Sequence, residues 1–204
     1  AFLEYEAMKD KFDYMRLWGV DSKEDIAKTL AVFGAFTEGL QLFASFAVLM
    51  NFPRQNRMKG MGQIVTWSVR DETLHTESAI KLFKTFIEEN PEVWNDKVKE
   101  EITNACSTVI EHEDAFINLA FELGGVKGME ADEVKQYIRY IADRRLSQLG
   151  LPHLYNIEKN PLPWMDEMLN AVEHTNFFEG RATEYSRAAT TGSWSDTFET
   201  AFGS

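Results

Sequence analysis

Apolar residues recur along most of the chain with a period near 3.6, which predicts helices rather than strands. Five prolines and the Gly124-Gly125 pair divide this pattern into segments. The spacing predicts a short connection around Pro53 and a shorter helical segment after Asn160-Pro161. The predicted long helices cover residues 2–18, 21–50, 57–89, 92–123 and 131–149.

Long helices with short connections predict an all-α fold, an antiparallel helical bundle. We expect this helical domain to cover residues 1–179. Residues 180–204 are rich in Ala, Thr, Ser and Gly and are expected to form a flexible tail. Asp21-Ser22, followed by two acidic residues, is typical of a helix N-terminus, and Gly150 is typical of a helix C-terminus.

The composition narrows the class of protein. The 204 residues carry a formal charge of -12, so the chain lacks the basic surface expected of a nucleic-acid binder. The single cysteine, Cys106, excludes an internal disulfide and a multi-cysteine zinc site, and it fits a reducing cytoplasm. No uninterrupted apolar run predicts a membrane helix, and the first residues have no signal-peptide character. Ala1 in place of Met suggests a trimmed or processed chain, or a fragment.

Glu72 and His75 lie three residues apart in the predicted third helix, so both side chains project from one face about one turn apart. A carboxylate oxygen and an imidazole nitrogen can then reach a common metal ion. Their neighbours on that face are apolar or small, and an unpaired acid there would be costly to bury. Because Glu-x-x-His also arises by chance, a solvated or salt-bridged pair is the alternative.

Glu38 lies within an apolar stripe of the predicted second helix. It needs a partner there, which is either a hydrogen-bonding group of another helix or a metal ion. Small Ala31 and Gly34 would let a neighbouring helix or a metal site approach closely. A Glu on one helix and Glu-x-x-His on its antiparallel neighbour form half of the di-iron or di-manganese carboxylate pattern of ferritin-like bundles. Carboxylates with one imidazole per metal suit Fe or Mn better than Zn or Cu.

These segments resemble the second-half ligand helices of the small subunit of class I ribonucleotide reductase. The matching residues are Glu38, Leu42 and Ser45-Phe46, followed by Arg70-Asp71-Glu72-Thr73-Leu74-His75. Similar segments at residues 111–114, 140–146, 160–164 and 176–179 extend the resemblance over nearly the whole chain. The resemblance implies a ferritin-like bundle and an oxidoreductase subunit that uses two metal ions (Fe, Mn/Fe or Mn) and O2 to generate an oxidant. The oxidant would be passed to a large subunit that reduces ribonucleotides to deoxyribonucleotides.

Carried over residue by residue, the resemblance implies three metal ligands, Glu38, Glu72 and His75. Asp71 would hydrogen-bond the histidine of the other metal and lie on the radical-transfer route. The alternative is a surface acid paired with Arg70 or Arg144.

The tail carries further residues of the resemblance. Tyr185 matches the tyrosine that passes the radical to the large subunit, and Glu179 matches an acid of the family's tail. Trp194 is the rival redox residue. Residues 198–202 pair aromatic side chains with an acid, like a peptide that anchors the large subunit, although Gly203-Ser204 departs from the apolar ending expected there.

The first half of such a site is missing upstream of Glu38, where no second Glu-x-x-His and no radical-bearing tyrosine can be identified. The expected partners are therefore an amino-terminal half of the small subunit, the large subunit, and a second small subunit in a dimer. Exposed apolar residues beside the acids should bind the missing half, and they are Leu42, Phe46, Val69 and Leu82. The alternatives are another di-metal carboxylate oxidase or monooxygenase, and a non-catalytic helical fragment that acts as an interaction module.

Overall fold

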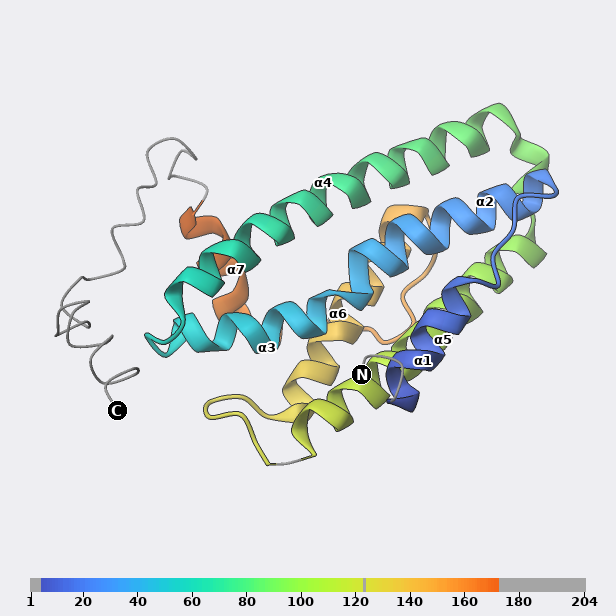
Figure 1. The fold of residues 1–204 in the computed structure, drawn as a ribbon. Coiled ribbons are helices and arrows are strands. Elements are labelled where there is room, and N and C mark those ends of the chain that lie inside the picture. Colours follow the sequence, from blue (N-terminus) through green and yellow to red (C-terminus); the bar gives the residue numbers. More distant parts are fainter. Residues whose placement is uncertain (1–4, 123, 173–204) are drawn as a thin grey trace, which may run out of the picture.

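A computed structural model of the protein describes residues 5–122 and 124–172, which form a helical bundle without a β-strand in either range (Figure 1). The prediction of an all-α fold is confirmed. The helices are α1 (Glu6–Met15), α2 (Lys23–Ala31), the π-helix η2 (Val32–Gln41), α3 (Phe43–Arg54), α4 (Lys59–Glu89), the 3₁₀ turn η3 (Pro91–Val93), α5 (Asp96–Phe121), α6 (Ala131–Leu149) and α7 (Pro163–Val172).

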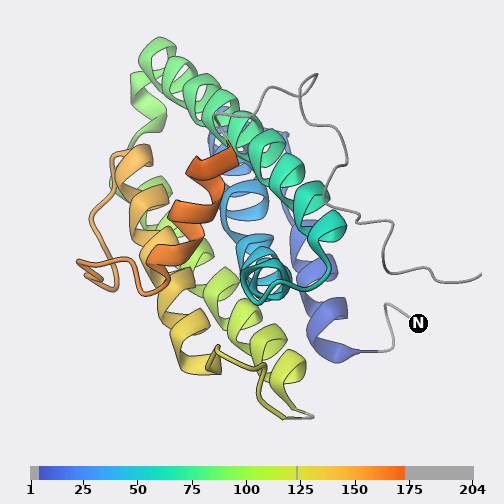
Figure 2. The same ribbon diagram turned by 90° about the vertical axis from the view of Figure 1, so that its left-hand side faces the viewer.

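The run formed by α2, η2 and α3 lies at the centre of the bundle. Figure 2 shows α3 nearly end on, with α4, α5 and α6 around it. By length and composition this run, Lys23–Arg54, could cross a membrane, with a mean hydropathy of 1.5 over its most apolar 18 residues. Because 61% of that window is buried inside the bundle, the position of a core helix accounts for its apolar character.

Local sequence signals fix several helix ends. The Ser22 hydroxyl accepts a hydrogen bond from the Asp25 backbone N–H (3.1 Å) and caps α2, as predicted. Asn95 caps α5 in the same way through the Val98 N–H (3.0 Å). Gly150 ends α6 in the left-handed conformation (φ +80°), which favours glycine.

The structure corrects the second predicted helix, whose α-helical geometry is interrupted by ten residues of π-helix. The connection expected at Pro53 was also placed wrongly, because Pro53 lies in the last turn of α3. The chain turns afterwards, where Asn56 and Met58 adopt positive φ angles (62° and 47°). The remaining differences are smaller: the first helix ends at Met15, and α5 begins at Asp96 after the 3₁₀ turn.

The expected exposed apolar surface is only partly right. Leu42 and Leu82 are exposed (37% and 57%), but Phe46 and Val69 are buried (8% and 4%). Both buried residues pack into the chain's own core, which also contains Phe36, Phe83, Cys106 and Tyr137.

Candidate metal centre

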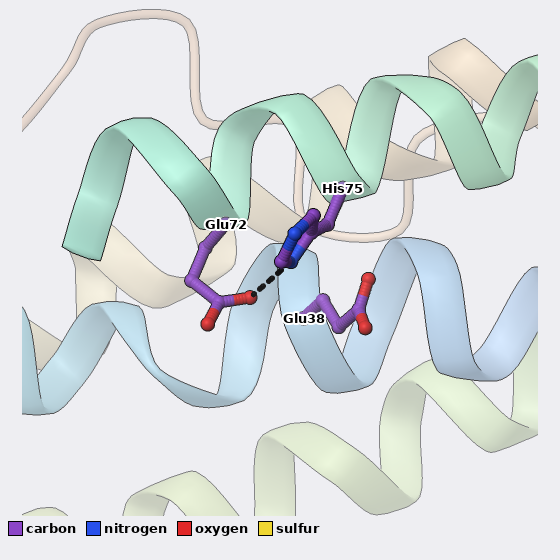
Figure 3. A group of neighbouring side chains, drawn as sticks. All are labelled: Glu38, Glu72 and His75. Atoms are coloured by element: carbon purple, nitrogen blue, oxygen red, sulfur yellow. Dashed lines mark ion pairs between the residues drawn. The ribbon is translucent and has the colours of Figure 1, made fainter. Parts of the chain in front are cut away.

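Three predicted ligands meet between η2 and α4 (Figure 3). Glu38 projects from η2 toward Glu72 and His75 of α4, and each offers a ligand atom within 4.8 Å of the others. The Nδ1 atom of His75 lies 3.5 Å from the Oε2 atom of Glu72. Ligand atoms held by bonds of about 2.1 Å lie up to roughly 4.2 Å apart around one ion. Small side-chain movements would therefore close these donors on a metal ion.

The donors line a cleft of about 620 Å³ between η2, α4 and α1. Much of its wall is apolar and comes from Met8, Phe12, Met15 and Leu42. Two carboxylates so close together repel each other, and an apolar wall screens this repulsion poorly. A divalent cation would relieve it, and two carboxylates with one imidazole suit Fe or Mn.

Two glycines of η2 allow α4 to approach closely. A Cβ atom added to Gly34 would lie 2.4 Å from Ala79 Cβ, and one added to Gly39 would lie 2.9 Å from Thr76 Cγ2. Ala79 and Thr76 lie on α4, just after the two ligands that it carries. The small residues therefore bring Glu38 within reach of Glu72 and His75, as Gly34 had suggested in the sequence.

Lys11 is a residue of the cleft that the sequence analysis missed. It lines the cleft from α1, forms an ion pair with Glu113 of α5 and donates to the Gln41 carbonyl (3.4 Å). Glu113 is fully buried, and burial raises the pKa of its carboxyl to about 7 although Lys11 opposes the shift. The signal available in the sequence was a lysine among the apolar residues Met8, Phe12 and Met15.

Asp71 lies on the exposed side of α4. In the described part of the chain it forms an ion pair with neither Arg70 nor Arg144, the arrangement considered as the alternative. Instead, the Arg144 guanidinium lies over the Tyr140 ring, 5.9 Å from its centroid. The role of Asp71 in radical transfer stays a prediction.

The tail residues named in the sequence analysis, Glu179, Tyr185, Trp194 and residues 198–202, lie outside the described residues. The expected flexible tail over residues 180–204 lies outside them as well, so these roles also stay predictions.

Residues 1–161 match the protein family described as "Ribonucleotide reductase, small chain". Among curated proteins, the chain is 45% identical over 212 residues to a probable ribonucleoside-diphosphate reductase small subunit of Invertebrate iridescent virus 3, covering 95% of this chain and 56% of the relative. It is 36% identical over 174 residues to the ribonucleoside-diphosphate reductase subunit beta of Chlamydia pneumoniae, covering 84% and 50%. The chain thus spans about half the length of these relatives.

Solved structures agree on the fold. A putative class I ribonucleotide reductase from Bacillus halodurans aligns with a TM-score of 0.75 at 20% sequence identity, covering 82% of this chain and 61% of the other. The R2 subunit of ribonucleotide reductase from Clostridium botulinum gives the same TM-score at 21% identity, covering 82% and 54%. These comparisons support the ferritin-like bundle.

Proposed function

This chain belongs to the ribonucleotide reductase small-chain family, and on that premise we propose that it forms part of the small subunit of a ribonucleoside-diphosphate reductase. Its own contribution is half of the ligands of a two-metal site. With O2, the metals (Fe, Mn/Fe or Mn) would supply the oxidising chemistry, which is used to reduce ribonucleotides in a large subunit. The family match favours this function over the other di-metal oxidases considered above.

The observation that carries the proposal is the convergence of Glu38, Glu72 and His75. The carboxylates would hold the metals through hard oxygen atoms, and His75 would contribute one imidazole nitrogen. The apolar cleft wall would lower the polarity beside Glu38 and Glu72, and the second segment would cover His75, whose side chain is 57% exposed. Asp71, on the outward side of the same helix, would hydrogen-bond a histidine supplied by the other half of the site.

The outward face of α4 supports a second polypeptide segment as the source of the missing ligands. Four large apolar residues are exposed along α4, at 61%, 40%, 62% and 57%: Ile64, Trp67, Leu74 and Leu82. Asp71 and Ser78 complete a series spaced by three or four residues, which is the pattern of a helix–helix seam. We propose that the amino-terminal half of the small subunit packs on this seam, in an assembly that also includes a second small subunit and the large subunit in the cytoplasm.

Tyr185 and Glu179 complete the proposal. Tyr185 would pass the oxidising equivalent to the large subunit by losing an electron and its phenolic proton. Glu179, in the same tail, would assist this transfer. The support for both is the sequence resemblance alone.

The test compares the metal content of the assembled protein for Glu72→Ala, His75→Ala and the control Glu88→Ala. Glu88 is an exposed acid near the end of α4, so its loss should leave the metal content unchanged. Each ligand variant should lose most of the metal while retaining its helical circular dichroism, because only a few ligands hold each ion. Full metal stoichiometry in either ligand variant would refute the assignment. Absence of metal from the wild-type assembly would favour the non-catalytic fragment.

A further inference from the structure

Glu38 owes its direction to an irregular helix. Residues Val32–Gln41 form a π-helix, in which hydrogen bonds join residues five apart, and α-helical geometry resumes at Phe43. In Figure 1 the ribbon turns more widely between α2 and α3. Gly34 and Gly39 are five residues apart, and both lie against α4, with Gly39 also against Arg145 of α6. A regular α-helix would place positions five apart on different faces, so the π geometry and the glycine spacing belong together.

Arg145 of α6 contacts both sides of the junction where the π-helix ends. Its Nε–H donates to the Gly39 carbonyl oxygen at 2.9 Å, directly after Glu38 in the chain. Its guanidinium lies over the ring of Phe43, the first residue of α3, 5.7 Å from the centroid. Gln148, one turn along α6, accepts a further hydrogen bond from Nη1 at 2.9 Å and orients the group.

This contact has a cost, because Arg145 is almost fully buried (6% exposed). No carboxylate in the described ranges forms an ion pair with it, and the Glu77 carboxylate acts on its charge only from a greater distance. Burial, with a smaller contribution from the neighbouring Arg144 charge, lowers the pKa of Arg145 to about 10, so the guanidinium is still charged at neutral pH. A buried charge without a counter-ion is unfavourable unless hydrogen bonds satisfy it. Here the carbonyl at the end of the π-helix is one of the two acceptors that do so.

We propose that Arg145 is a positioning residue for Glu38, which it turns toward Glu72 and His75 by locking the junction between the π-helix and α3. If residues 32–41 relaxed to an α-helix, each turn would hold fewer residues. Residues before and after the junction would then rotate relative to each other by roughly 100° for each residue that the wider π-helical turns no longer hold. Glu38 would then leave the common point that the three donors share. This inference rests on the proposed metal-binding function of that site.

The test titrates the same small-subunit assembly, this chain together with the segment that supplies the missing ligands, with Mn²⁺ and counts the free ion by electron paramagnetic resonance. Wild type should bind Mn²⁺ at the three-donor site. Arg145→Met keeps the apolar part of the side chain but removes the donors, and we expect it to weaken Mn²⁺ binding by at least about tenfold, as loss of groups that orient metal ligands does. Arg145→Lys, which can still donate to the Gly39 carbonyl, should recover part of the affinity. The Arg145→Lys variant also keeps the test informative if Arg145→Met does not fold.

Arg139→Met is the matched control, because Arg139 lies on the same helix and pairs with Asp114 of α5 at 2.6 Å, away from the junction. It should lose thermal stability and keep wild-type Mn²⁺ affinity. Wild-type affinity in Arg145→Met, or an equal loss in Arg139→Met, would overturn the positioning role. His75→Ala separates the two proposals: if it binds Mn²⁺ as wild type does, the metal site itself is wrong. If only His75→Ala fails to bind, the site stands and the role of Arg145 falls.

Discussion

Gly34→Ala tests the close packing that brings α4 to the π-helix. The added methyl carbon would lie 2.4 Å from Ala79 Cβ and 3.5 Å from two backbone atoms of Ala79. Unstrained carbon contacts lie at about 3.5–4.0 Å, so the two helices would have to separate by roughly 1–1.5 Å. The obstacle is fixed to the α4 backbone and cannot rotate away.

The free-energy change follows from two opposing effects. Overpacking a core costs about 1–3 kcal/mol, and we take the upper end because a backbone must move. Replacing glycine in a helix returns about 1 kcal/mol, and Gly34 has no positive φ angle that would forbid alanine. The net destabilisation should be about 2 kcal/mol, which lowers Tm by roughly 4–8 °C in a chain of this length.

The assay is a double-mutant cycle, in which circular dichroism monitors the unfolding of each variant by denaturant. Ala79→Gly removes the obstructing methyl group, so the double variant should recover the steric cost and show a coupling energy of about 3 kcal/mol. Gly125→Ala is the control, since an added Cβ there meets nothing within 4 Å. Additive effects of Gly34→Ala and Ala79→Gly would refute the close packing of α4 on η2. The same displacement should weaken Mn²⁺ binding, because Glu72 and His75 move with α4.

Three further predictions concern other parts of the molecule. Burial raises the pKa of Glu113 from 4.5 to about 7, so this group's contribution to stability is full below pH 4.5 and is lost as the pH rises through 7. Glu113→Gln should lack that pH dependence in unfolding experiments, and an unchanged profile would contradict the raised pKa. The Asp143 carboxylate accepts backbone N–H bonds from Leu154, Tyr155 and Ile157 at 2.9–3.1 Å. In Asp143→Asn, the amide NH2 group would face one of these backbone N–H groups, so the free energy of unfolding should fall by about 1–3 kcal/mol. A free energy of unfolding equal to that of wild type would contradict this prediction. Tyr185→Phe should abolish ribonucleotide reduction by the full assembly and leave its metal content unchanged. Ribonucleotide reduction at the wild-type rate would mean that Trp194 carries the radical instead, or that the proposed pathway through the tail is wrong.

The sequence predicted those features that depend on one helix at a time. Residues 131–149 are a helix as predicted, because an unbroken apolar period ends at a glycine that can adopt positive φ. Glu72 and His75 meet because their spacing of three acts within a single regular helix. Glu38 joins them because an antiparallel neighbour is the simplest connection for two long helices with a short loop.

The sequence did not predict the features that depend on irregular helix geometry or on contacts between distant segments. The π-helix barely disturbs the apolar periodicity, and its visible sign is the five-residue spacing of Gly34 and Gly39. Pro53 looked like a helix end, but α3 includes it and continues for one more residue, Arg54, so the proline removes one backbone hydrogen bond in the last turn without breaking the helix. The ion pair of Lys11 with Glu113 joins two helices far apart in the sequence, and no local pattern announces such a partner.

The single cysteine has a practical consequence for measuring how this bundle opens. Cys106 is completely buried in α5, and burial raises the pKa of its thiol to about 12. In the folded chain it is therefore both shielded and protonated, and an alkylating reagent can react only after the surrounding helices separate. The rate of its alkylation then reports the free energy of that opening at one defined place in the core. Slower alkylation on addition of Mn²⁺ would measure how strongly a metal ion at the cleft stabilises the packing around α5.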